Sequence, residues 1–286
     1  MTTITHFRQP PATEPAATQP DAVQPEPAVR AAWPSGTRRA LETLTPWAII
    51  AAVVAAWWVA ASGSLIFPTP PETVTGLKDL VTSGLLWRHV WTSILRVAIA
   101  YFTAAAIAIP LGILMGWFKP LDTALNPLFQ LMRPISPIAW TPIAILWFGI
   151  GGISPVFLIF LGAFFPIVVA TAAAVRGVSA HYVRAARNFQ LSGRTYFAHV
   201  LFPAALPEIL TGMRIALGVA WLVVVAAEMV ATESGLGYMI IDARNQVTRY
   251  DLVVGAMVLI GVIGLILDGS MRLVERIEIV RWRDGR

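Results

Sequence analysis

The sequence predicts an all-α membrane protein with about six transmembrane helices, and three observations support this prediction. Only 13% of the 286 residues are charged, whereas soluble domains carry roughly 25%, so the chain lacks the polar surface that a globule needs in water. The mean hydropathy is +0.69. Uncharged runs recur along the chain, each close to the roughly 20 residues that cross a bilayer.

Residues 1–45 are predicted to form a disordered cytoplasmic tail. They are rich in proline, alanine and threonine and poor in large apolar side chains, so they cannot bury a core. Prolines separate the N-terminus from the first apolar run, unlike the arrangement of a cleavable signal peptide. The transmembrane domain is therefore expected over residues 46–286.

The predicted spans follow the uncharged runs of the sequence. The run at 134–175 is long enough for two helices, with Gly149-Ile-Gly-Gly152 as the hairpin between them. Pro134, Pro137 and Pro142 interrupt the first of these two helices, so its boundaries are the least defined. The six predicted spans are 47–67, 92–117, 128–148, 154–175, 206–229 and 252–271.

The positive charges predict that both termini and the loop at residues 176–205 lie in the cytoplasm. This loop carries four arginines and no acidic residue, and the C-terminal tail after Met271 carries five more arginines. In the predicted outer loops, basic and acidic residues balance. Positive charge gathers on the cytoplasmic side of membrane proteins. The pI near 10.1 therefore reflects topology, and no basic, aromatic-studded platform for nucleic acid is present.

The 176–205 loop is short, basic and amphipathic. Tyr182, Ala185, Ala186 and Phe189 share one face at helical spacing. Leu191-Ser-Gly193 then interrupts the helix, and Ser192 is the expected cap of the next one. A continuous helix on the membrane surface is the alternative interpretation. The interruption favours two short helices that dock into a groove of a partner protein.

This loop resembles the "EAA" coupling loop of bacterial ABC importer permeases. Ala185-Ala186 is followed at the matching distance by Val200-Leu-Phe-Pro203, while Arg184, Gln190 and Phe202 replace the usual Glu, Gly and Leu. Further segments resemble permeases of the nitrate, sulfonate and taurine group, most of all the aliphatic sulfonate and taurine members, over roughly residues 70–280. These segments are RPISPIAWTPIAILWFGIG (133–151), LGAFFPIVV (161–169), LPEILTGMRIALGVAWLVVVAAEMV (206–230) and SGLGYMIIDAR (234–244).

The resemblance implies a type I ABC importer permease fold with a cytoplasmic coupling helix, in a bacterial inner membrane. Two permease copies would form the translocation path, and cytoplasmic ATPase subunits would dock on the coupling loops and bind the ATP and Mg²⁺. A periplasmic or lipid-anchored solute-binding protein would deliver the cargo, with sulfonate or taurine first and nitrate, cyanate or bicarbonate next. The implied coupling residues are Arg184, Ala185, Ala186, Gln190, Leu191, Gly193, Val200 and Pro203.

The chain itself is expected to be non-catalytic and to bind no cofactor or metal. Neither of its two lysines, Lys78 and Lys119, belongs to a phosphate-binding Gly-x-x-x-x-Gly-Lys-Ser/Thr loop. The absence of cysteine excludes disulfides, thiol nucleophiles and thiolate metal sites. ATP hydrolysis would therefore be supplied by another chain.

Three ionisable residues inside the spans are candidates for the translocation path. Arg96 and Glu228 lie near the outer ends of their spans, where a guanidinium could meet an anionic cargo. The alternative is that Arg96 pairs with Glu228 or extends outward to water. Arg214 lies about two turns into the fifth span, has no local partner, and is expected to face the bundle or the inner mouth of the pore.

Small residues predict close packing and a turn. Gly212, Ala216 and Ala220 are spaced by four, which lets helices approach closely. Ser234-Gly-Leu-Gly237 predicts a turn that leads into a re-entrant segment.

An ion-coupled secondary transporter is the main alternative function. It predicts coupling-ion residues near mid-bilayer and internal repeats, and neither is clear in the sequence. A channel would need a carbonyl filter or a charged ring. An intramembrane protease would need Gly-x-Ser-Gly, His-Glu-x-x-His or paired aspartates, and Asp268 is the only aspartate in a predicted span.

Overall fold

The computed structural model describes residues 35–64, 67–191, 193–246 and 249–275. The chain forms two units, residues 1–53 and 54–286. Within the described ranges every regular element is a helix. The predicted disorder before residue 35, the predicted cap at Ser192 and the arginines from Arg276 onward lie outside the described residues.

The first helix, α1 (Ser35–Ala61), passes from the first unit into the second. The disorder predicted for residues 35–45 is therefore wrong: this stretch lacks the prolines of the preceding tail and contains helix-forming Ala40 and Leu41. The apolar part of α1, Leu44–Ala61, is long enough to cross a membrane. The helix ends six residues before the predicted end of the span, because Gly63 adopts a left-handed φ of +115°. Trp57 Nε1 then donates a hydrogen bond to the Pro68 carbonyl, 3.0 Å away.

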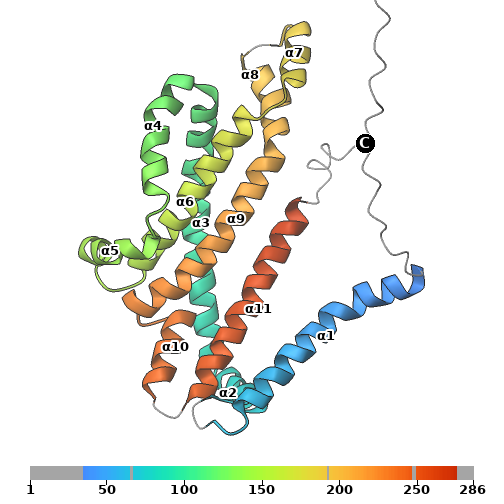
Figure 1. The fold of residues 1–286 in the computed structure, drawn as a ribbon. Helices are drawn as coiled ribbons and strands as arrows, with labels where there is room; N and C mark the ends of the chain where they lie inside the picture. The colour runs from blue at the N-terminus through green and yellow to red at the C-terminus, as the bar shows by residue number, and fades with distance from the viewer. Residues whose placement is uncertain (1–34, 65–66, 192, 247–248, 276–286) are drawn as a thin grey trace, which may run out of the picture. The chain divides into compact units, whose positions relative to one another are not determined.

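The core of the second unit consists of three long helices that lie side by side in Figure 1: α3 (Leu85–Trp117), α6 (Ile153–Arg176) and α9 (Phe202–Ala231). Leu158, Ile159 and Ile167 of α6 are fully buried between the other two helices. Without a hydrophobic driving force in lipid, such helices associate through close packing. The sequence of α6 therefore provides the centre of the bundle.

Glycines permit the close crossings of these helices. A Cβ added at Gly112 of α3 would lie 2.8 Å from the carbonyl oxygen of Val168 in α6. A Cβ at Gly212 of α9 would collide with the Cβ of Ala170. The row Gly212, Ala216 and Ala220 is buried, so its prediction as a packing face is confirmed.

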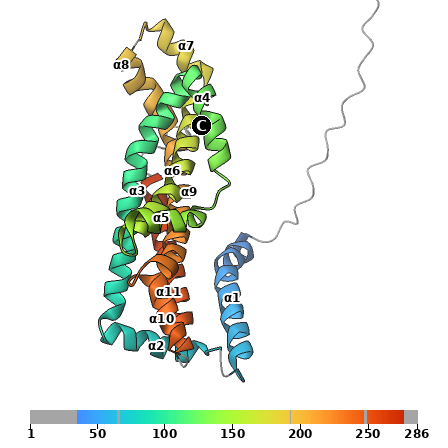
Figure 2. The same cartoon turned by 90° about the vertical axis from the view of Figure 1, so that its left-hand side faces the viewer.

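Two ends of the second unit carry different short elements (Figures 1 and 2). The helices α7 (Ala180–Asn188) and α8 (Gly193–Tyr196) lie at one end, called here the α7 end. The helices α2 (Pro70–Thr82) and α10 (Leu236–Asn245) lie at the opposite, α10 end. The last helix, α11 (Tyr250–Glu275), packs on α2, α9 and α10.

The α2 helix was not predicted from the sequence. It begins with a capping box, in which the Thr69 N–H donates to Glu72 Oε2 at 2.7 Å. The α2 helix also packs closely on α11: a Cβ added at Gly76 would collide with the carboxylate of Asp251. Arg249 bonds to Asp251 at 3.2 Å and reaches Asp79 of α2 at 3.4 Å.

The single span predicted at 128–148 is wrong, because this segment does not form one helix. It consists of α4 (Lys119–Met132), a break at residues 133–136, the 3-10 turn η1 (Pro137–Trp140) and α5 (Thr141–Phe148). Pro137 and Pro142 stand in the first turns of η1 and α5, where a missing N–H is tolerated, whereas a helix interior would lose hydrogen bonds there.

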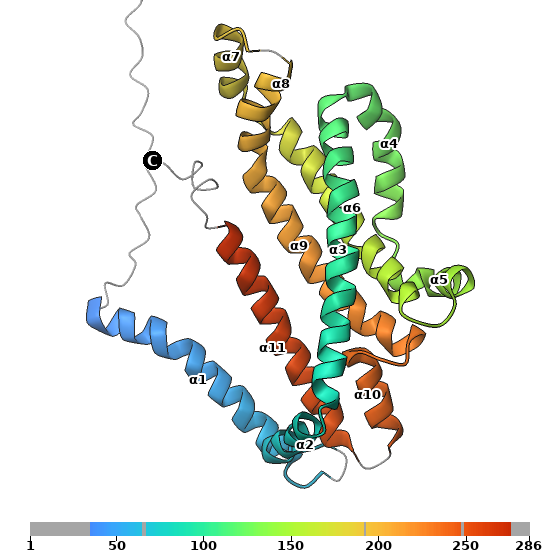
Figure 3. The same ribbon diagram turned by 180° about the vertical axis from the view of Figure 1, so that it is seen from behind.

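The broken segment still returns the chain from one end of the second unit to the other. Trp117, at the end of α3, lies against Tyr196 with ring centroids 5.6 Å apart, at the α7 end. The Gly151 N–H donates to the carbonyl of Ala231, 3.1 Å away, at the far end of α9. Figure 3 shows α4 running back beside α3. Five helices of the described ranges are long and apolar enough to cross a membrane.

Candidate functional site

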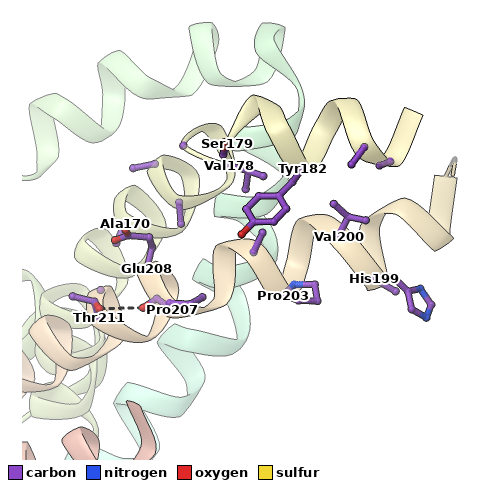
Figure 4. A pocket seen from close by; sticks show the side chains of 18 of the residues that line it. Ala170, Val178, Ser179, Tyr182, His199, Val200, Pro203, Pro207, Glu208 and Thr211 are labelled. Carbon is purple, nitrogen blue, oxygen red and sulfur yellow. Dashed lines mark hydrogen bonds between the residues drawn. The ribbon is translucent and has the colours of Figure 1, made fainter. Parts of the chain in front are cut away.

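A hollow of about 1000 Å³ opens at the α7 end, between α7 and the helices α6 and α9. Tyr182, Ala185, Ala186 and Phe189 all line it, so the shared face predicted for this helix is confirmed. Figure 4 shows Tyr182 pointing from α7 toward the α9 side of the hollow. The α7 helix therefore stands off the bundle and leaves an apolar surface beneath it.

The exposure of the α7 residues separates those that shape the loop from those that can touch a partner. Ala186 is only 3% exposed, whereas Phe189 is 78% exposed, and Arg184 and Ala185 are also exposed. Because Phe189 adjoins the apolar lining of the hollow, it extends a contiguous exposed apolar surface, which is typical of a binding site. Ala186 fits against its own chain, so a bulky residue there would deform the loop.

The predicted interruption of the loop has a defined geometry at the end of α7. The Leu191 N–H donates to the Ala186 carbonyl at 3.0 Å, and Gln190 between them adopts a left-handed φ of +53°. This is the Schellman arrangement, in which glycine is the preferred residue at the left-handed position. The structure thus explains why glycine is usual at this point of the resembling loops, and Gln190 adopts the conformation at a cost.

Replacing Gln190 by glycine is expected to stabilise the loop by about 1 kcal/mol, because the left-handed conformation costs an L-residue roughly that amount. Hydrogen exchange at the Leu191 amide measures the effect as slower exchange. Gln190→Ala keeps a Cβ and should give no such gain; equal protection in both variants would show that backbone strain is not the cause.

The other predicted coupling residues lie on the path from α7 into α9. Gly193 opens α8 with a φ of +56°. A π-helical turn, η2 (Phe197–Leu201), follows and contains Val200, and Pro203 lies in the first turn of α9. Both Val200 and Pro203 line the hollow, as does Leu191. Five of the eight predicted coupling residues therefore line the hollow. Gln190 and Gly193 have left-handed backbone in the turn between α7 and α8, and Arg184 is exposed on α7.

A buried ion pair occupies the opposite, α10 end. Arg96 of α3 donates from Nη1 to Glu228 Oε1 of α9 at 2.8 Å, and Glu228 is fully buried. Arg96 also donates to the Ser234 carbonyl at 2.7 Å and to Ser234 Oγ at 2.8 Å. Pairing of Arg96 with Glu228, one of the alternatives predicted from the sequence, is confirmed.

Side chains around the same pair accept hydrogen bonds from the backbone N–H groups at the start of α10. The Gly237 N–H donates to Glu228 Oε2 at 3.0 Å, and the Leu236 N–H donates to Ser93 Oγ at 2.9 Å. Ser93 Oγ in turn bonds to the Glu228 carboxylate at 2.8 Å, and the Gly235 N–H donates to His89 Nδ1 at 3.1 Å. Three successive N–H groups at the start of α10 are thus bonded by side chains of α3 and α9, and a carboxylate suits the positive end of a helix dipole.

Two glycines of the predicted Ser234–Gly237 turn permit this arrangement. A Cβ at Gly235 would collide with the Glu228 carboxylate, and one at Gly237 would collide with the carbonyl oxygen of Val225 and lie 2.8 Å from Glu228 Cβ. The turn leads into α10, whose Met239, Ile240 and Ala243 are buried. The predicted turn is confirmed, and the segment after it is a short, largely buried helix.

Arg214 has partners that the sequence did not reveal. It bonds to Asp268 at 3.1 Å and to Glu275 at 2.8 Å, both on α11, and Arg272 also pairs with Asp268 at 2.8 Å. These partners lie more than 50 residues later in the chain, so only the packing of α9 on α11 brings them within reach. The arrangement ties the two helices together near the α7 end.

His89 and Ser93 were missed by the sequence analysis, although a signal was present. Together with Arg96 they form a polar stripe spaced by four and three residues at the start of an otherwise apolar helix, so all three lie on one face. Their partners on α9 and α10 are visible only in the fold.

Comparisons with known proteins show which family the chain resembles. The profile of the family described as "Binding-protein-dependent transport system inner membrane component" matches residues 108–277. The taurine transport system permease protein TauC of Escherichia coli is 35% identical over 87% of this chain and 92% of its own length. The nitrate import permease protein NrtB of Synechocystis is 34% identical over 83% of this chain and 90% of its own.

A solved structure of the MetNI methionine ABC transporter, described as inward facing, has the same fold as this chain. The TM-score is 0.60 at 18% sequence identity, over 67% of this chain and 95% of the matched one. At this identity the likeness concerns the fold alone, which is the type I ABC importer permease fold predicted from the sequence.

Proposed function

Because the chain belongs to the family of binding-protein-dependent transport system inner membrane components, we propose that it forms, as a dimer, the translocation path of an ATP-driven importer. It is a membrane-embedded ABC importer permease subunit of the sulfonate, taurine and nitrate group. In the proposed complex two cytoplasmic ATPase subunits bind the ATP and Mg²⁺, and a solute-binding protein delivers the cargo from the outer side. The α7 end faces the cytoplasm.

The observation that carries this proposal is the form of the α7 end. Two short helices stand off the bundle and expose Phe189 beside an apolar hollow of about 1000 Å³. The α8 helix then continues through η2 into α9, so a force on the loop acts directly on a membrane-crossing helix. A partner that binds this loop and changes its own conformation can therefore move α9. Binding that favours one of two conformations is the general cause of such domain motions.

The cargo is proposed to be a small anion or zwitterion. Sulfonate or taurine comes first, and nitrate, cyanate or bicarbonate follows. The relatives named for taurine and nitrate transport support this range. Binding measurements on the cognate solute-binding protein decide among these cargoes, because in such systems that protein selects what is delivered.

Co-purification and uptake test the proposed function. The tagged chain should recover an ATPase subunit from the native membrane, and uptake should stop when the catalytic site of that ATPase is inactivated. A secondary transporter is the competing function. Uptake that continued on an ion gradient with an inactive ATPase would support the competitor and overturn the proposal.

Phe189→Asp is expected to abolish recovery of the ATPase, because it replaces the most exposed apolar side chain of α7 by a charge. Membrane insertion and the thermal stability of the isolated permease should not change. The matched control is Asn188→Asp, which adds the same charge to an exposed residue of α7 that does not line the hollow, and it should recover the ATPase normally. Normal ATPase recovery with Phe189→Asp would show that docking occurs elsewhere.

A further inference from the structure

A continuous helical path joins the two ends of the second unit. From Gly193 to Ala231 the chain is helical through α8, η2 and α9. Glu228 lies in the last turn of this path, about 50 Å from Gly193 at 1.5 Å per residue. Glu228, which belongs to the buried cluster at the α10 end, is thus connected through one continuous helical path to the coupling loop at the α7 end.

The cluster joins three elements at one point. Glu228 of α9 accepts bonds from Ser93 and Arg96 of α3 and from the Gly237 N–H of α10. Arg96 in turn holds Ser234, just before α10, through two further bonds. Neither charged group is left unpaired, and the glycines at 235 and 237 leave no room for a side chain between α10 and Glu228.

A charged pair at this place is not explained by stability alone. A buried ion pair costs desolvation, and an apolar pair of similar volume is often as stable or more so. An apolar pair, however, could neither accept the Gly237 N–H, as Glu228 does, nor donate to the Ser234 carbonyl, as Arg96 does. A buried backbone group that loses its partner is costly. The pair is therefore suited to fix the position of α10 through hydrogen bonds, which an apolar pair could not form.

We infer that Arg96 and Glu228 are positioning residues that couple α10 to the movement of α9. When the coupling loop is displaced, α9 carries the displacement to Glu228, and the cluster imposes it on α10 and on the start of α3. The inference rests on the proposed function, since ATP binding by a docked ATPase supplies the displacement. It assigns to the pair the transmission of movement to the outer surface, not contact with cargo.

Single-cysteine reporters test this inference on the whole importer complex. This chain contains no cysteine, so a cysteine introduced at an exposed position is the only labelling site of the permease, whose labelling is read after it is separated from the other subunits. Asn245→Cys places a reporter at the end of α10, and Ala180→Cys places one at the start of α7. The rate of maleimide labelling is measured for each reporter with and without ATP, in the native background and in the double variant Arg96→Met/Glu228→Met.

In the native background both reporters should change their labelling rate when ATP binds. In the double variant the Ala180→Cys response should remain, whereas the Asn245→Cys response should be lost together with stimulation of the ATPase by the solute-binding protein. An unchanged Asn245→Cys response in a correctly assembled double variant would overturn the inference while leaving the proposed function intact. If neither reporter responded in the native background, both the inference and the proposed function would be overturned.

The double variant removes both charges, so it avoids the unpaired buried charge that either single variant would leave. Should it fail to assemble, Arg96→Lys provides a second comparison, because it keeps a positive charge beside Glu228 and removes the guanidinium fork that bonds the carbonyl and the hydroxyl of Ser234. A partial loss of the α10 response is then expected, and a full response would overturn the inference. Asp79→Asn, which loses a 3.4 Å ion pair at the same end of the unit, is the matched control and should respond as the native complex does.

Discussion

Replacing Gly237 by alanine is expected to abolish the assembled importer, because one methyl group cannot be accommodated there. The added Cβ would collide with the backbone carbonyl oxygen of Val225 and lie 2.8 Å from Glu228 Cβ. Neither atom is the end of a flexible side chain, so α10 must shift and the bond from the Gly237 N–H to Glu228 is lost. Overpacking alone costs about 1–3 kcal/mol. The loss of one hydrogen bond to the buried Glu228 carboxylate destabilises the fold further.

Thermal unfolding of the detergent-solubilised permease measures this effect, together with the amount of complex recovered. The matched control is Gly218→Ala in α9, where an added Cβ meets no atom within 4 Å. Alanine favours a helix over glycine by about 0.5–1 kcal/mol, so this control should melt at the same or a higher temperature. Equal melting of the two variants would show that the α10 start tolerates displacement.

Gly112→Leu is expected to force α3 away from α6 and to destabilise the bundle strongly. A Cβ alone at this position would lie 2.6 Å from Thr171 Cβ and 2.8 Å from the Val168 carbonyl oxygen, and leucine adds three further carbons. In a membrane, helices that cannot approach closely lose the packing that holds them together. The loss should exceed the roughly 1–3 kcal/mol of ordinary overpacking, because backbone atoms are involved.

Size-exclusion profiles before and after heating measure this loss as aggregation at a lower temperature. Gly261→Leu in α11 is the control, because an added Cβ there meets no atom within 4 Å. A monodisperse Gly112→Leu permease with native thermal stability would contradict the role assigned to this crossing.

The long helices could be predicted from the sequence because hydropathy reports them directly. Predicted spans at 154–175, 206–229 and 252–271 correspond to α6, α9 and α11 within a few residues at most ends. The span predicted at 128–148 failed because hydropathy does not register the missing N–H groups of its prolines. Single prolines are tolerated inside α3, α6 and α9. At 134–142, however, three prolines within nine residues remove three N–H donors, and the helix is broken there.

Two other short helices, α2 and α10, were not predicted as helices, for a different reason. With 13 and 10 residues, α2 and α10 are below the length that identifies a span. A local signal for α2 was nevertheless present, because Thr69 and Glu72 have the spacing of a capping box.

A signal for close helix packing was also missed. Gly112 and Gly116 form a small-xxx-small pair on α3. The close approach of Gly116 to Val175 shows that this pair was informative.

Side-chain partners were the least predictable part of the site. The sequence indicated that the charge of Arg96 needs a partner or access to water within the membrane, and Glu228 was one of the predicted partners. It did not indicate that the carboxylate also bonds the start of α10, or that Arg214 pairs with Asp268 and Glu275. Such pairings depend on the rotation of each helix about its own axis, and an apolar sequence defines that rotation only loosely.

The π-helical turn at Phe197–Leu201 has a consequence for the direction in which the coupling surface points. A π turn contains one residue more than an α turn, and each residue of an α-helix rotates the chain by about 100°. The residues before the turn are therefore out of phase with those of α9 by about that angle. Deleting one residue within 197–201 would restore a regular helix and rotate α7 about the α9 axis, so that Phe189 would face a different direction although every membrane-crossing residue stayed in place.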